Sequence, residues 1–187
     1  MADQIQTTRA AASRPLGVLI RKYVFSTDHK TIGIQYFFLA LVAALTGVAM
    51  SLLMRLRLAW PEARWPMLEA IFPEGFKDGL MQPEFYLAMV TMHGTIMVFM
   101  VLSTAPQGAF GNYFLPIQIG ARDMAFPVLN MLSFWITLLS FVVLMAAFFV
   151  AGGAPLGGWT FYPTLSAFPS AGPGQAQGAD LWLVSIA

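Results

Sequence analysis

Three long apolar stretches, separated by segments rich in polar residues, glycine or proline, organise this chain. Lys30 and Arg55 bracket 24 uncharged residues, and the 37 residues from Phe85 to Ala121 include no Asp, Glu, Lys or Arg. A third apolar stretch covers 128–150. About 20 apolar residues cross the ~30 Å hydrocarbon core as a helix, whereas a closed barrel would show short alternating segments. The pattern therefore predicts an all-α transmembrane bundle with spans at about 31–54, 85–105 and 127–150.

Residues that break helices predict where the connections between these spans lie. Proline and glycine predict one loop over 55–84, a second over 106–126, and an irregular segment from the third span to about 179. A new apolar segment begins at Asp180 and covers only ~10 Å before the sequence stops. We therefore expect the start of a fourth helix, residues 1–25 as a polar tail, and 26–187 as one transmembrane unit. The first span has no small-residue cleavage site after it, so it is expected to remain as an anchor.

Composition and charge agree with this class and set the orientation. Charged residues are 10% of the chain, against about 25% in soluble domains. Six basic residues precede the first span or fall in the 106–126 loop, and four fall in the 55–84 loop. The positive-inside rule then predicts a cytoplasmic N-terminus. No basic cluster is dense enough to bind nucleic acid, and the absence of cysteine rules out thiolate ligands in this sequence.

His93 is the first candidate for chemistry, because ionisable side chains within a membrane usually face a cofactor, a cavity or an ion path. It lies on a predicted helix face with Tyr86, Met89, Met97 and Met100, and Gly94 beside it leaves room for a flat group. One interpretation is axial ligation of haem by a neutral imidazole. The other is a histidine that hydrogen-bonds a neighbouring helix, with the methionines as ordinary packing. Spacing alone leaves both open, and it disfavours zinc.

A polar line along the third span is the second candidate. It starts at Asp123 and continues with side chains at helical spacing: Asn130, Ser133, Thr137 and Ser140. A polar stripe on a membrane helix should face protein or water. The functional interpretation is a proton-conducting water chain with the carboxylate at its mouth. The alternatives are helix–helix contacts through small hydroxyl residues and, for Asp123, stabilisation of a helix N-terminus.

Four motifs in order resemble the N-terminal third of subunit I of haem–copper oxidases, the cytochrome c oxidase family. They are STDHKTIG at 26–33, TMHG at 91–94, GNYFLPIQIGARDMAFPVLN at 111–130, and GGWTFYPTLS at 157–166. The resemblance implies that His93 is one of two axial ligands of a low-spin haem, expected to be haem A. It also implies that Arg55 contacts the haem periphery, and that Tyr86, Trp159 and Tyr162 lie near the haem.

The same resemblance implies a proton pathway that enters at Asp123. Its lower part would be lined by Asn112, Asn130, Ser133 and Tyr36, with His29 near its mouth. The chain departs from the common family pattern at Arg122, Val128 and Met131, where many members have Pro, Arg and Asn. Arg122 adds a cation beside the proposed entrance. Arg57 stands where some relatives have an acid that helps bind a surface cation, so we do not expect that cation site here.

The implied reaction is reduction of O2 to water coupled to proton translocation across a bacterial cytoplasmic membrane. A second haem, a copper ion, the remainder of subunit I, a copper-bearing subunit II and other oxidase subunits would complete the enzyme. The ligands of the second haem and the copper are absent from this sequence, so we expect either a truncated part of a longer subunit or one piece of a split subunit, and we favour the first. The donor would be cytochrome c or, in a second reading, quinol. A nitric oxide reductase is disfavoured by the Asp123 loop, and a non-catalytic helical scaffold remains the alternative from another class.

Overall fold

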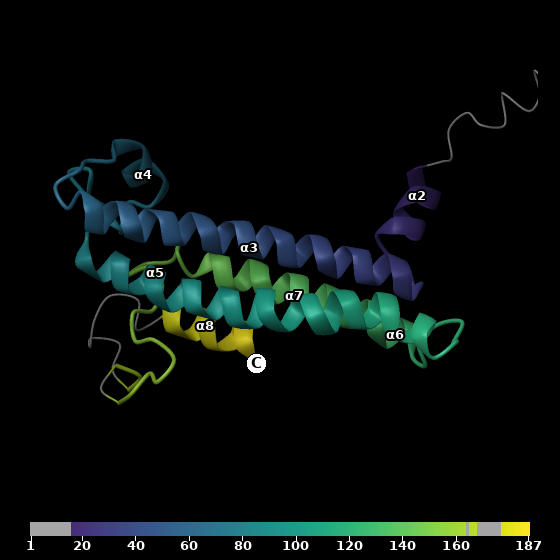
Figure 1. The fold of residues 1–187 in the computed structure, drawn as a ribbon. Helices are drawn as coiled ribbons and strands as arrows, with labels where there is room; N and C mark the ends of the chain where they lie inside the picture. Colours follow the sequence, from purple (N-terminus) through teal and green to yellow (C-terminus); the bar gives the residue numbers. More distant parts are fainter. Residues whose placement is uncertain (1–15, 164, 168–176) are drawn as a thin grey trace, which may run out of the picture.

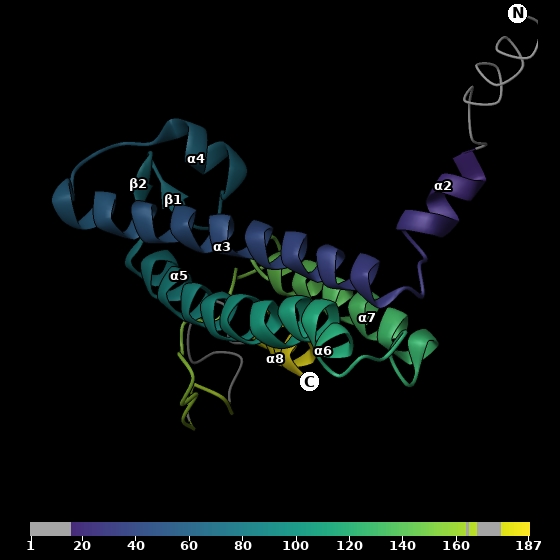
Figure 2. The same cartoon turned by 45° about the vertical axis from the view of Figure 1, so that its right-hand side comes forward.

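The computed structural model describes residues 16–163, 165–167 and 177–187, and it confirms the predicted all-α bundle. Three helical segments are long and apolar enough to cross a membrane: His29–Ala59, Pro83–Gln118 and Pro127–Ala146. They lie side by side in both views of the fold (Figures 1 and 2), and the short C-terminal helix packs beside them. Of the predicted tail, residues 1–15 lie outside the described part of the chain.

The elements follow in the order that the apolar pattern requires. The helices are α2 (Leu16–Tyr23), α3 (His29–Ala59), α4 (Pro66–Ile71), α5 (Pro83–Thr95), the π-helix η1 (Ile96–Gly111), α6 (Asn112–Gln118), α7 (Pro127–Ala146) and α8 (Gln177–Ile186). Two short strands, β1 (Phe76–Lys77) and β2 (Leu80–Met81), pair antiparallel between α4 and α5.

The first span is longer than the predicted 31–54, because polar residues at both ends can join a helix without entering the hydrocarbon. At its start the Asp28 carboxylate accepts hydrogen bonds from the Thr31 backbone N–H and hydroxyl, both at 2.9 Å, which caps α3. At its end Arg55 and Arg57 stay in the last helical turns, where long basic side chains can reach the interface. The helix stops at Trp60, before Pro61.

The second span corrects the predicted loop at 106–126. The helix that starts at Pro83 continues through Pro106 and Pro116 and ends at Gln118, so the connection is shortened to 119–126. Residues 96–111 form a π-helix, and hydroxyls such as that of Thr104 bond the carbonyl five residues earlier. Such local widening and hydroxyl bonding let a membrane helix tolerate proline.

Close packing against α3 holds this widened helix in place. A Cβ atom at Gly108 would lie 2.7 Å from the Tyr36 ring, so only glycine allows the two helices to approach here. The core that results is built mainly from buried residues of α3, α5 and η1: Ile32, Tyr36, Leu39, Ala43, Met89, Met92, Ile96 and Met100. Large apolar side chains elsewhere on the helices are exposed, as a bilayer-facing surface requires.

The third and fourth helices begin and end near the expected positions. The third span starts at Pro127 as predicted but ends at Ala146 instead of 150. Phe148 turns inward there, with its ring 5.9 Å from those of both Phe72 and Phe85, and this aromatic contact replaces a further helical turn. The last helix starts at Gln177, three residues before the predicted Asp180.

The 55–84 connection has structure that the apolar pattern did not indicate. Helix α4 and the β1–β2 hairpin lie at the end of the bundle where α3 stops (Figure 2). The hairpin turns at Asp78 and Gly79, whose φ angles are 54° and 79°. An Asp-Gly pair is a strong signal for a two-residue hairpin turn, so this element was open to prediction.

Candidate functional site

His93 lies in the last turn of α5, with its imidazole directed at α3. Its Nδ1 lies 3.0 Å from the carbonyl oxygen of Gly47. A carbonyl only accepts hydrogen bonds, so Nδ1 carries the proton and donates it, which leaves the Nε2 lone pair free. Metal-bound histidines usually make this kind of hydrogen bond with the other ring nitrogen. The ring is partly exposed, and its chemistry fits an axial ligand to haem iron.

The contact depends on the glycine at position 47. A Cβ atom there would lie 2.6 Å from the Met97 sulfur and 3.6 Å from Nδ1 of His93. The absent side chain therefore lets α3 come close enough for its carbonyl to reach the imidazole. Nothing in the local sequence pairs residues 47 and 93, so sequence reasoning had no signal for this contact.

The other residues expected near a haem are not all brought together. Trp159 stacks on Phe99 with ring centroids 4.7 Å apart, and its Nε1 would be 3.5 Å from a Cβ at Gly94, beside His93. Tyr86 precedes His93 by two helical turns and lines an open pocket of about 400 Å³ at the end of α3. Arg55 is exposed two turns beyond Gly47, and Tyr162 is 68% exposed.

A polar pocket of about 370 Å³ forms the second candidate site. It gathers side chains from α3, η1, α6 and α7: Tyr36, Ser103, Thr104, Gln107, Asn112, Asn130, Ser133 and Thr137. The hydroxyl groups of Tyr36 and Ser133 hydrogen-bond at 2.9 Å, although the residues are 97 positions apart. Four of the expected pathway residues thus line one cavity.

One group in this pocket has no protein partner. The side-chain Nδ2 of Asn130 is buried and makes no hydrogen bond within the described part of the chain. A buried amide without a partner costs free energy unless water satisfies it. The pocket is polar and has room for several water molecules, which need two to four polar neighbours each. The polar lining and the size of the pocket, rather than this closed-off donor, indicate a hydrated cavity.

Asp123 and His29 lie at the margins of the pocket. Asp123 is exposed in the 119–126 connection, and its carboxylate accepts a hydrogen bond from the Met124 backbone N–H at 2.7 Å. Met124, the next residue, lines the pocket. His29 is only 2% exposed, and its Nδ1 donates to the Asn112 carbonyl at 2.9 Å. The carboxylate is thus exposed and not part of the lining, one residue before Met124, which is.

Three of the pocket residues were missed from sequence. Ser103, Thr104 and Gln107 lie where the second span was expected to end, so they were assigned to a span terminus and a loop. In the structure they belong to η1 and line the same cavity as Asn112. Gln107 follows Thr104 by three positions and Ser103 by four, and this helical spacing was the available signal.

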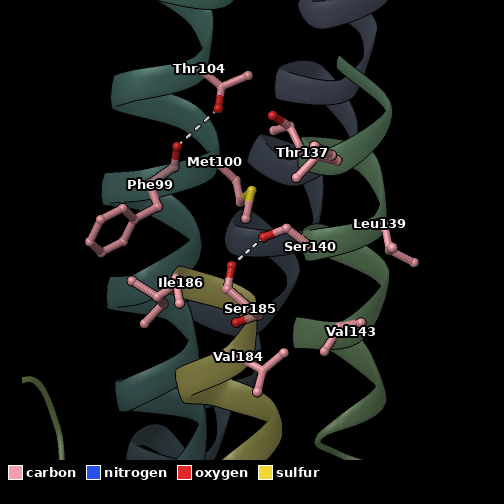
Figure 3. A pocket seen from close by; sticks show the side chains of 12 residues that line it. Phe99, Met100, Thr104, Thr137, Leu139, Ser140, Val143, Val184, Ser185 and Ile186 are labelled. Atoms are coloured by element: carbon pink, nitrogen blue, oxygen red, sulfur yellow. Dashed lines mark hydrogen bonds between the residues drawn. The ribbon is translucent and has the colours of Figure 1, made fainter. Parts of the chain in front are cut away.

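A second pocket of about 380 Å³ continues from the first, with Thr104 and Thr137 in both linings. Figure 3 shows these two threonines toward one end and Ser140 directed at Ser185 of α8. The Ser140 hydroxyl donates to the Ser185 carbonyl. The polar stripe expected on the third span therefore lines these two pockets from Asn130 to Ser140, and it bonds α3 through Ser133 and α8 through Ser140.

Comparison with known families and proteins gives a consistent result. The family described as cytochrome C and quinol oxidase polypeptide I matches residues 31–187. An "Alternative cytochrome c oxidase subunit 1" from Bradyrhizobium diazoefficiens is 44% identical over 88% of this chain and 25% of its own length. A "Cytochrome c oxidase subunit 1" from Thermostichus vulcanus is 40% identical over 88% of the chain and 26% of its length.

A "Ubiquinol oxidase subunit 1" from Acetobacter aceti is also similar, with 37% identity over 91% of this chain and 23% of the relative. The chain thus spans about a quarter of the length of these curated relatives.

Proposed function

Because this chain belongs to the cytochrome c and quinol oxidase polypeptide I family, we propose that it supplies part of the catalytic subunit of a respiratory terminal oxidase. The family consists of haem–copper oxidoreductases of respiratory electron transport. The proposed reaction is reduction of O2 to water with proton translocation. The observation that carries the proposal is the hydrogen bond from His93 to the Gly47 carbonyl, which presents Nε2 as a ligand.

His93 is proposed as one axial ligand of a low-spin haem, which we take to be haem A. When bound, the haem supplies one-electron transfer. The Gly47 carbonyl orients the imidazole, and Trp159 closes the side of α5 next to Gly94. Arg55, Tyr86 and Tyr162 would contact the haem periphery from the end of the bundle that holds the hairpin.

The polar pocket is proposed as the lower part of a proton pathway. Asp123 would collect protons from solvent beside Met124, and water held by Asn112, Asn130, Ser133 and Tyr36 would pass them inward. The hydroxyl groups of Tyr36 and Ser133 can each donate and accept, so a proton can move through them without displacement of heavy atoms. His29 would keep the Asn112 backbone in place through its buried hydrogen bond.

The remaining parts of the proposal concern the complete enzyme. A second haem and copper would be held by the rest of subunit I, and electrons would enter through a copper-bearing subunit II in a complex with other oxidase subunits. The complex would lie in a bacterial cytoplasmic membrane, with the N-terminus of this chain in the cytoplasm. Basic residues predominate at that end of the sequence.

Cytochrome c is the electron donor that we propose. The two relatives named for cytochrome c oxidase share 44% and 40% identity with the chain, and the one named for ubiquinol oxidase shares 37%. Oxygen consumption of the purified complex with reduced cytochrome c and with a quinol would decide between the donors.

The central experiment is His93→Ala in the intact complex, with His29→Ala as the matched control. The chain has two histidines, and both donate Nδ1 to a backbone carbonyl. We expect the low-spin haem band in the reduced-minus-oxidised spectrum to be lost in His93→Ala and retained, per mole of folded complex, in His29→Ala. A normal low-spin band in His93→Ala would remove this residue from the ligand set. Absence of any haem band from the wild-type complex would favour the scaffold.

A further inference from the structure

The short helix α2 has an apolar face against which no other described part of the chain packs. At 100° per residue Leu19, Ile20 and Tyr23 fall within about 100° of arc, and Lys22 lies roughly 110° from the centre of that arc. All three apolar side chains are exposed, at 37%, 41% and 53%. An isolated helix of eight residues is only marginally stable in water. Contact between this face and an apolar surface would therefore stabilise α2.

The attachment of α2 to the bundle fixes where that surface lies. The Gln35 side-chain amide donates to the carbonyls of Tyr23 and Val24, at 2.7 and 3.1 Å, and so ties the end of α2 to the first turns of α3. The Phe25 ring stacks on Trp135 of α7 with centroids 5.1 Å apart. These contacts hold α2 at the end of the membrane-crossing helices, on the same side as the Asp123 loop.

The direction and charge of α2 identify its partner. In Figures 1 and 2, α2 does not prolong α3 but leaves it at a steep angle, as a helix lying along the membrane plane would. Residues 14–30 carry four basic and one acidic side chain. Anionic phospholipid headgroups attract such a segment, and amphipathic helices with basic polar faces bury their apolar face at the headgroup boundary.

We propose that α2 is an interfacial helix that binds the anionic phospholipid surface of the membrane at the Asp123 end of the bundle. Leu19, Ile20 and Tyr23 would enter the headgroup–acyl boundary. The Lys22 ammonium lies 5.2 Å from the centre of the Tyr23 ring, close enough for both to share one headgroup region. This role is independent of oxygen chemistry, since it depends only on the position of α2 beside a membrane span.

Spin labels on the full complex in lipid nanodiscs test the proposal. The chain contains no cysteine, so Ile20→Cys and Val18→Cys can be labelled once reactive cysteines elsewhere in the complex are replaced. Val18 is also exposed, at 49%, but lies on the opposite side of α2 from Ile20. In discs containing phosphatidylglycerol, we expect the Ile20 label to be several-fold more accessible to oxygen than to a water-soluble nickel chelate, and the Val18 label to show the reverse.

In discs of phosphatidylcholine alone, the two labels should differ less in their relative accessibility to oxygen and to the nickel chelate. Equal access of the nickel chelate to both labels would place α2 in water and overturn the proposal. Protection of the Ile20 label from both reagents would show that another protein subunit covers it, which is also contrary to the proposal. An Ile20 signal that does not respond to phosphatidylglycerol would rule out the anionic lipid as partner.

Discussion

At the scale of single residues, two histidines illustrate how backbone carbonyls select a tautomer. His29 and His93 each donate Nδ1 to a carbonyl of another helical segment, at 2.9 and 3.0 Å. His29 is fully enclosed, whereas His93 remains partly exposed. The same hydrogen bond therefore serves packing at one position and leaves a usable lone pair at the other.

A substitution at Asp123 tests the proposed proton entrance. Asp123→Asn keeps an acceptor for the Met124 N–H but has no carboxyl group to bind and release a proton. We expect turnover to fall roughly 10²-fold, the lower end of what a positioned acid–base group contributes, with haem content unchanged. Oxygen consumption and proton release in vesicles measure the effect. Asp78→Asn is the matched control, because it changes an acid in the hairpin at the opposite end and asparagine accepts the positive φ there. Unaltered rate and pumping in Asp123→Asn would mean that protons enter elsewhere.

At the scale of elements, the N-terminus of α3 depends on one cap. Partial burial of Asp28 opposes its ionisation, but hydrogen bonds from the Thr31 N–H and hydroxyl, with the electrostatic effect of the neighbouring His29 and Lys30 side chains, lower its pKa below the ordinary 3.8. Because the folded-state pKa is lowered, the stabilisation is present above 3.8. It is lost as the pH falls through the lower value.

Asp28→Ala should therefore cost about 1 kcal/mol of stability at neutral pH, as loss of a helix cap does. Asp28→Asn keeps an acceptor for Thr31 and should lose less. Below the lowered pKa, wild type and Asp28→Asn should become similar. Thermal unfolding of the purified complex across this pH range measures the difference. A neutral-pH midpoint for Asp28→Ala equal to that of wild type would show that the cap contributes nothing.

Some helix boundaries could be predicted from the sequence of each segment alone, and others could not. The existence of three spans followed from uncharged run length, a property of each segment alone. The continuation of the second span through Pro106 did not, because it depends on contact between Gly108 and Tyr36, 72 positions away. Assigning 106–126 to a loop in turn placed Gln107 outside the polar site. His93 and the stripe on α7 were found from composition, but their partners required the packed structure.

At the scale of the whole molecule, a line of hydrogen bonds connects three distant parts of the chain. The Trp182 Nε1–H of α8 donates to the Thr95 hydroxyl at 2.8 Å, and that hydroxyl donates to the Thr91 carbonyl at 2.8 Å. The Thr91 hydroxyl accepts from the Gly158 backbone N–H at 3.0 Å. These bonds thus join α8, the second span and the 147–163 segment on the side opposite α3.

Thr95→Val tests this connection. The substitution keeps the shape of the side chain but leaves the buried Trp182 N–H without an acceptor, which should cost about 1–3 kcal/mol. The unfolding midpoint of the complex is the measurement. Thr46→Val is a suitable control, since the Thr46 hydroxyl bonds only the Val42 carbonyl of its own helix. Equal midpoints for the two variants would show that the line of bonds does not stabilise the assembly.

The carbonyl of Gly47 has a consequence for biogenesis. It can select the His93 tautomer only after α3 and α5 have met, and membrane segments emerge from the ribosome in order, N-terminal first. In the proposed role of His93 as a haem ligand, contact between α3 and α5 would be the step that orients the imidazole for its metal group.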